Sequence, residues 1–167
     1  MSLDADLLLQ ALRLARKERT RPRQASLRRA VSTAYCALFH LLIREATSIL
    51  VARPSLRGCF SRGFDHRDMK NASKAYANPS PNQLPSLTGG SPSPPQITHV
   101  ALTFVELQEA HHEADYNVQS RSSRTEVITL ISHVEQAFLS WRAMRTEPIA
   151  RMYLSALLMW NKGWNRQ

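Results

Sequence analysis

The stretch from Ala25 to Val51 constrains the fold of this chain most, because it holds neither glycine nor proline and repeats its apolar residues at helical spacing. The repeating residues are Leu27, Ala30, Ala34, Leu38 and Leu41. Spacings of three and four residues place such side chains on one face of an α-helix. A proline, Pro54, bounds the run. A helix of this length predicts the central member of a helical bundle.

Five other segments show helical periodicity, and we find no β-strand alternation and no internal repeat. They cover Leu8–Ala15, Phe64–Tyr76, Ile97–Ala114, Val127–Trp141 and Ile149–Trp160. Before the fourth of these, Ser123 and Glu126 form the Ser-x-x-Glu pattern of a helix capping box. We therefore predict an all-α chain with four principal helices and additional shorter ones.

Residues 78–96 break this helical pattern, because they are rich in proline, serine and glycine. Such composition predicts a flexible loop, here between the second and third main helices. At the other end, residues 148–167 form a helical extension that could complete the bundle or cover a dimer partner. We expect residues 1–167 to form a single domain.

The composition is that of a globular chain with a strong positive charge. Of 167 residues 43% are hydrophobic, and the net charge is +9. That charge favours an anionic partner: RNA, DNA, an acidic protein or an anionic membrane surface. The two cysteines, Cys36 and Cys59, form no CxxC motif, which favours a reducing compartment. With an acidic N-terminus unlike a signal peptide and no apolar run of about 20 residues, we expect a cytoplasmic protein without a membrane span.

Much of the positive charge lies around the turn between the first two helices. The residues are Arg16, Lys17, Arg19, Arg21, Arg23, Arg28 and Arg29, with Glu18 as the one acid among them. Guanidinium groups suit phosphate oxygens, so an RNA backbone is a natural ligand. A solvated helix end explains the cluster equally well, since it contains no aromatic residue for base stacking.

The segment from Glu109 to Asn117 gathers titratable side chains at the end of a helical pattern, and it reads Glu-Ala-His-His-Glu-Ala-Asp-Tyr-Asn. Helical spacing turns His111 toward the core and makes His112 and Asp115 surface neighbours. Such a pair can act as a general acid and base. The alternative is that these are polar residues at the core edge. No HExxH motif or phosphate-binding glycine loop occurs, and we expect neither a metal nor a cofactor.

Two segments together resemble the HEPN superfamily of small helical bundles. Arg28 to His40 contains Ala-Val-Ser-Thr-Ala-Tyr-Cys-Ala-Leu-Phe-His, which is similar to a conserved helix of the family. Phe104 to Tyr116 ends in Ala-Asp-Tyr, which is similar to the branch whose third helix closes with that tag. The resemblance covers most of Ala25 to Met144. It implies an up-and-down bundle of four or five helices, usually a homodimer with its site in the dimer cleft.

The resemblance also implies a role in toxin–antitoxin or defence systems. Active members are similar to metal-independent ribonucleases with an Arg-x(4–6)-His motif, and others pair with a nucleotidyltransferase or act as binding modules. In this chain no histidine has an arginine at that offset, and position 111 is His111 where the branch carries arginine. Catalysis therefore stays open, between an endoribonuclease and a non-enzymatic module that binds a partner protein or nucleotide.

Residue roles follow for the case that the chain acts on RNA. His112 would act as the general acid or base, Asp115 would orient the His112 imidazole, and Tyr116 would shape the pocket. The phosphate-binding residues would be Arg21, Arg23, Arg28 and Arg29.

Overall fold

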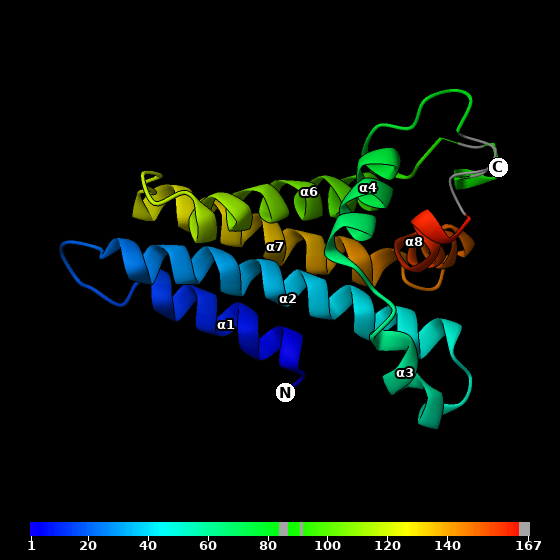
Figure 1. Ribbon diagram of the computed structural model, residues 1–167, viewed down its shortest axis with the longest axis horizontal. Coiled ribbons are helices and arrows are strands. Elements are labelled where there is room, and N and C mark those ends of the chain that lie inside the picture. Colours follow the sequence, from blue (N-terminus) through cyan, green and yellow to red (C-terminus); the bar gives the residue numbers. More distant parts are fainter. Residues whose placement is uncertain (84–86, 91, 164–167) are drawn as a thin grey trace. The chain divides into compact units, whose positions relative to one another are not determined.

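Helices joined by short connections make up the computed structural model, which describes residues 1–83, 87–90 and 92–163 (Figure 1). The α-helices are α1 (Leu3–Ala15), α2 (Gln24–Leu50), α3 (Arg57–Ser61), α4 (His66–Ala77), α6 (Pro95–Tyr116), α7 (Arg124–Met144) and α8 (Pro148–Met159). Two short 3₁₀ helices are η1 (Pro54–Leu56) and η2 (Trp160–Lys162). No strand occurs in the described ranges, so the predicted all-α class is confirmed.

Contacts divide the chain into two compact units. Unit 1 comprises Met1–Leu41 and Glu106–Phe138, and unit 2 comprises Leu42–Val105 and Leu139–Gln167. Helices α2, α6 and α7 each contribute residues to both units. The single domain that the sequence predicted stays a prediction.

Unit 1 packs the apolar stripes that the sequence predicted for its helices. On α2 all five predicted residues are at most 4% exposed, and four of them are fully buried. The predicted residues of α7 within this unit, from Val127 to Phe138, are buried as well. Helix α1 packs less deeply: Ala11 and Ala15 are buried as predicted, whereas Leu8 and Leu12 are half-buried.

The capping box predicted at the start of α7 is confirmed. The backbone N–H of Ser123 donates to the Glu126 carboxylate at 2.7 Å, and the Glu126 N–H donates to Ser123 Oγ at 3.2 Å. These two bonds satisfy donors that a helix N-terminus otherwise leaves unpaired. They start α7 at Arg124 and so fix where the connection from α6 ends.

Unit 2 has two tyrosines at the contact between α4 and α8. The rings of Tyr76 and Tyr153 are fully buried, with centroids 4.9 Å apart. The Tyr153 hydroxyl shares a hydrogen bond of 2.8 Å with the buried Ser73 hydroxyl, and Tyr76 donates to the Leu87 carbonyl at 2.7 Å. Both phenols therefore have a partner in an otherwise apolar interior, as a buried hydroxyl requires.

The proline-rich segment 78–96 contains a packed anchor. Leu87 is 2% exposed, and its carbonyl holds the Tyr76 hydroxyl. Gly89 and Gly90 follow with φ of 69° and 90°, a backbone region that glycine adopts without strain. Helix α6 begins at Pro95, inside the predicted loop. Residues 84–86 and 91 lie outside the described residues, and the flexibility of the segment stays a prediction.

The predicted C-terminal extension is helical over its described part, as α8 and η2. No helix in the described part of the chain is both long and apolar enough to cross a membrane.

Candidate functional site

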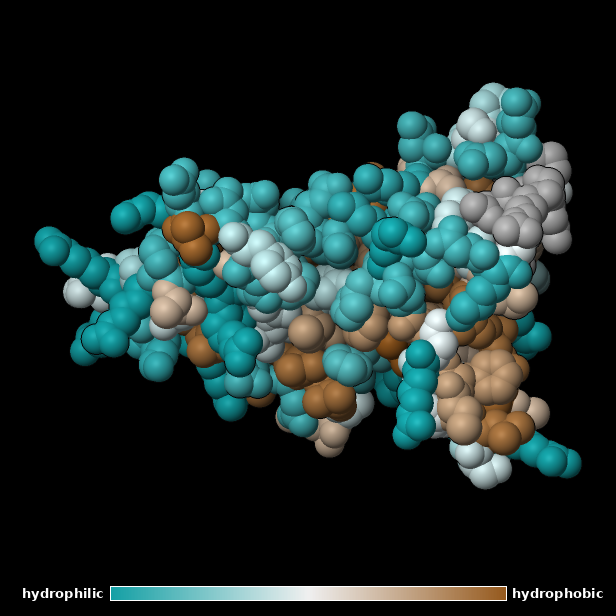
Figure 2. Space-filling view, in the orientation of Figure 1, coloured by the Kyte–Doolittle hydropathy of each residue, from teal (hydrophilic) through white to brown (hydrophobic). Residues whose placement is uncertain are grey.

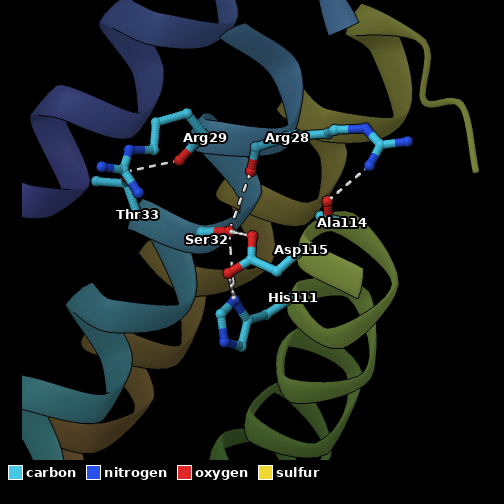
Figure 3. A network of polar contacts seen from close by, with 7 residues as sticks. All are labelled: Arg28, Arg29, Ser32, Thr33, His111, Ala114 and Asp115. Atoms are coloured by element: carbon cyan, nitrogen blue, oxygen red, sulfur yellow. Dashed lines mark hydrogen bonds and ion pairs between the residues drawn. The ribbon is translucent and has the colours of Figure 1, made fainter. Parts of the chain in front are cut away.

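The end of α6 meets α2 at three polar residues, Ser32, His111 and Asp115, which we call the His111 cluster (Figure 3). His111 Nδ1 lies 3.3 Å from Asp115 Oδ2 and 3.3 Å from Ser32 Oγ. The Ser32 hydroxyl donates to Asp115 Oδ1 at 2.5 Å. The imidazole stacks on Tyr35, with ring centroids 4.7 Å apart and planes 13° from parallel. The inward orientation predicted for His111 is therefore confirmed.

The predicted pairing of Asp115 with His112 is wrong, because the Asp115 carboxylate contacts His111 instead. Residues four apart on a helix face each other as well as residues three apart, so spacing alone did not decide between the two histidines. The buried Ser32 on α2 decides it by hydrogen-bonding the carboxylate on that side. His112 points elsewhere, with its ring 4.9 Å from that of Tyr116, and both residues are exposed.

The His111 cluster does not have the geometry of a nucleophilic triad. A triad needs the histidine between the serine and the carboxylate, with a different ring nitrogen facing each. Here a single nitrogen, Nδ1, faces both groups, and the Ser32 proton goes directly to Asp115. The carboxylate and hydroxyl beside Nδ1, together with the stacking on Tyr35, hold the imidazole ring in place. The cluster thus orients an imidazole and does not activate a serine.

Arg28 forms a clamp on the connection between α6 and α7. Its two terminal nitrogens donate to the carbonyls of Ala114, Asn117, Val118 and Ser120 at 2.6–3.0 Å. Carbonyls at a helix C-terminus lack partners within the helix and carry partial negative charge, so a guanidinium stabilises them. These bonds use Nη2 and one of the two N–H groups of Nη1, and the phosphate contact that the sequence predicted for Arg28 stays a prediction.

Further contacts tie the α1–α2 connection to the α6–α7 connection. The Arg124 guanidinium donates to the carbonyls of Glu18 and Arg19. The Gln24 side chain both donates to and accepts from the backbone of Ser122, at 2.9 and 3.1 Å. Ser26 donates to Glu18 at 2.8 Å, and this bond lowers the pKa of the Glu18 carboxyl. The two connections therefore form one end of unit 1, which we call the basic loop end, residues 16–23 and 116–124.

The basic loop end has both exposed cations and exposed apolar side chains. The exposed cations are Arg16, Lys17, Arg19, Arg21, Arg23 and Arg121. Among them Tyr116 is 72% exposed and Val118 is 85% exposed. Figure 2 shows mainly hydrophilic residues with apolar ones among them over this end, at the left of the view. The sequence lacked an aromatic residue within the arginine cluster, and the fold supplies one from a segment about 95 residues further along the chain.

The structure separates the predicted site residues into three groups. Arg21, Arg23, His112 and Tyr116 are exposed at or beside the basic loop end. Asp115 belongs to the His111 cluster, and Arg28 belongs to the clamp. Arg29 is exposed on α2 and lines an open hollow of about 230 Å³ next to α1. In the described ranges no three His, Cys, Asp or Glu side chains gather as a metal ion would require.

Two residues of the site, Ser32 and Tyr35, were missed by the sequence reasoning. Both lie on α2 at helical spacing from Arg28, on the side that faces α6. A small hydroxyl residue within an otherwise apolar helix stripe was the available signal. Comparisons of the chain with protein-family models, with curated proteins and with solved structures found no match.

Proposed function

We propose that this chain is an RNA-binding protein of the HEPN-like, toxin–antitoxin or defence type, and that it binds a single RNA strand through the basic loop end. The proposal is supported by the contacts between the two connections, since they bring the arginine-rich α1–α2 connection and the segment that follows the exposed Tyr116 to the same end of unit 1. The HEPN-like bundle, a homodimer and a nucleotidyltransferase partner belong to the same proposal, on the resemblance of the Arg28–His40 and Phe104–Tyr116 segments.

The chemistry of this end suits nucleic acid better than an acidic protein. Arginine forks bind phosphate oxygens in two-point contacts, and a strand offers a phosphate at every nucleotide. An exposed tyrosine adds a face on which a base stacks, worth about 1–3 kcal/mol per base. Stacking needs an unpaired base, so a single strand fits this end better than a duplex. An acidic peptide would use the arginines and leave Tyr116 without a matching partner.

The binding proposal is tested by removing the positive charges of Arg21 and Arg23. In Arg21→Ala/Arg23→Ala we expect weaker binding of a single-stranded RNA. The slope of log binding constant against log salt concentration should become shallower by about 1.4, at about 0.7 per lost phosphate contact. Fluorescence anisotropy across a salt series measures both. The matched control is Arg142→Ala/Arg151→Ala, which removes the same charge from exposed positions in unit 2. Equal weakening in the two pairs would show attraction to net charge only and would contradict a defined interface.

Cleavage is the second candidate, and the exposed His112 beside Tyr116 favours it. Attack by a ribose 2′-hydroxyl requires a group that removes or supplies a proton, and an exposed imidazole can do so. In EDTA we expect slow cleavage of single-stranded RNA that falls about a hundredfold in His112→Ala, with binding retained. His133→Ala, which alters another partly exposed histidine, is the control. Intact RNA in every sample would contradict cleavage and favour the non-enzymatic binding module that the sequence left open.

A further inference from the structure

The open hollow between α1 and α2 lies outside the clamp and the basic loop end. Its walls are Leu7 and Gln10 from α1, and Arg29, Ser32, Thr33 and Cys36 from α2. Ser32 belongs to both the hollow and the His111 cluster, and Figure 3 shows it between the Arg29–Thr33 side of α2 and the His111–Asp115 pair. The hollow holds about 230 Å³, below the roughly 300 Å³ at which pockets for drug-sized ligands begin. It suits one ring system rather than a whole nucleotide.

Of the two hydroxyl groups that line the hollow, the Thr33 hydroxyl has lone pairs left for a ligand. The Ser32 hydroxyl is engaged by Asp115 Oδ1 at 2.5 Å, by His111 Nδ1 at 3.3 Å and by the Arg28 carbonyl at 3.2 Å. The Thr33 hydroxyl donates its one proton to the Arg29 carbonyl at 2.7 Å, so its remaining capacity is that of an acceptor. Donors come from the Arg29 guanidinium and the Gln10 amide, and the amide also offers a carbonyl oxygen. A fitting ligand must therefore carry both N–H donors and acceptors.

Electrostatics argue against an anion in the interior of the hollow. Burial raises the pKa of the Cys36 thiol, and the nearby Asp115 carboxylate raises it further, while Arg29 lowers it. The thiol stays neutral, and the carboxylate behind Ser32 adds negative potential where a phosphate would need positive. The positive charge of Arg29 is exposed. Phosphate therefore suits the exposed side of Arg29, and a neutral group suits the interior.

We infer that this hollow receives one unstacked nucleobase with an exocyclic amino group from an RNA strand held at the basic loop end. The amino group would donate to the Thr33 oxygen, and ring acceptors would receive from Gln10 or Arg29, while Leu7 packs on the ring. Arg29 lies in the second turn of α2, six residues after Arg23, which directly precedes that helix, and six residues span about 9 Å along a helix axis. The inference rests on the proposed RNA binding and adds base preference to it.

Cytosine and uracil provide the sharpest test, because they have nearly the same shape and differ only at position 4, amino against carbonyl, and at N3, acceptor against N–H donor. We expect oligocytidine to bind about fivefold more tightly than oligouridine, the effect of one or two net hydrogen bonds. In Thr33→Val and in Gln10→Leu the preference should fall below about twofold, with oligouridine binding unchanged. Thr129→Val, on the exposed face of α7, is the control and should keep the preference. Circular dichroism checks that each variant is folded.

Free cytidine and uridine separate this inference from the proposed function. Amide chemical shifts of α1 and α2 should respond to cytidine, and Thr33→Val should abolish the response. Equal binding of both oligonucleotides, or a preference unchanged in Thr33→Val and Gln10→Leu, would overturn the inference and leave RNA binding at the basic loop end standing. Failure of both oligonucleotides to bind would overturn the proposed function, and the cytidine response of the hollow would still decide the inference.

Discussion

Replacing Arg28 by methionine should lower the free energy of unfolding by about 3 kcal/mol. Methionine keeps an unbranched stem but removes a guanidinium that donates to four carbonyls of the α6–α7 connection. Hydrogen bonds from a charged donor contribute about 1.5–3 kcal/mol each, and partial exposure to water reduces the sum well below four such bonds. Urea denaturation followed by circular dichroism measures the change.

The neighbouring Arg29→Met variant is the matched control, because Arg29 is exposed and the two substitutions remove the same charge. We expect its effect on stability to stay within about 0.5 kcal/mol. Similar losses in the two variants would show that Arg28 contributes through net charge, and the clamp would be ruled out as the cause.

The clamp also predicts how Arg28 affects RNA binding. If Arg28 positions the loop, Arg28→Met weakens binding by loosening the residues around Tyr116 and leaves the salt slope unchanged. If it contacts phosphate, the slope falls by about 0.7. The sequence suggested the second role, and the four carbonyl bonds support the first. Faster hydrogen exchange at Asn117–Ser120 in the variant would identify the loosened backbone.

The helices of this fold could be predicted because each depends on local sequence. The Ala25–Val51 run appears as α2 over Gln24–Leu50, and the Ser123–Glu126 box starts α7 at the following residue. The α4 prediction is also close, at His66–Ala77. The anchor at Leu87 could not be predicted from local sequence, because its partner Tyr76 lies on another element. The composition of the segment indicates only that it is rich in turn residues.

The site shows the same division between local and long-range information. The sequence placed His111 inward correctly, since that follows from helical phase alone. It assigned Asp115 to the wrong histidine, because the deciding partner, Ser32, lies on another helix. The bonds from Arg28 to the α6–α7 carbonyls could not be predicted for the same reason. Long polar side chains reach several partners within the same helical phase, so their pairing depends on the packed neighbour.

Raising the pH should weaken unit 2 through its two buried tyrosines. Burial raises the pKa of Tyr76 and of Tyr153 well above the usual value, and the Ser73 hydrogen bond offsets only part of the shift for Tyr153. In the unfolded chain both titrate near the ordinary value of about 10. Above that pH the unfolded state releases protons that the folded state keeps, so stability present below about pH 10 is lost as pH rises, by about 1.4 kcal/mol per tyrosine per unit.

At about pH 11 the two tyrosines together should cost about 2–3 kcal/mol relative to about pH 9. Urea midpoints from tryptophan fluorescence give the measurement, since Trp141 lies in unit 2 with its ring 6.5 Å from that of Tyr153. The variant Tyr76→Phe/Tyr153→Phe loses two buried hydrogen bonds and should be less stable at neutral pH, yet its alkaline slope should be much shallower. Lysines titrate identically in both proteins, so the difference between the slopes belongs to the phenols. Parallel slopes would mean that these hydroxyls ionise in the folded protein, which their full burial and their bonds to Ser73 and Leu87 oppose.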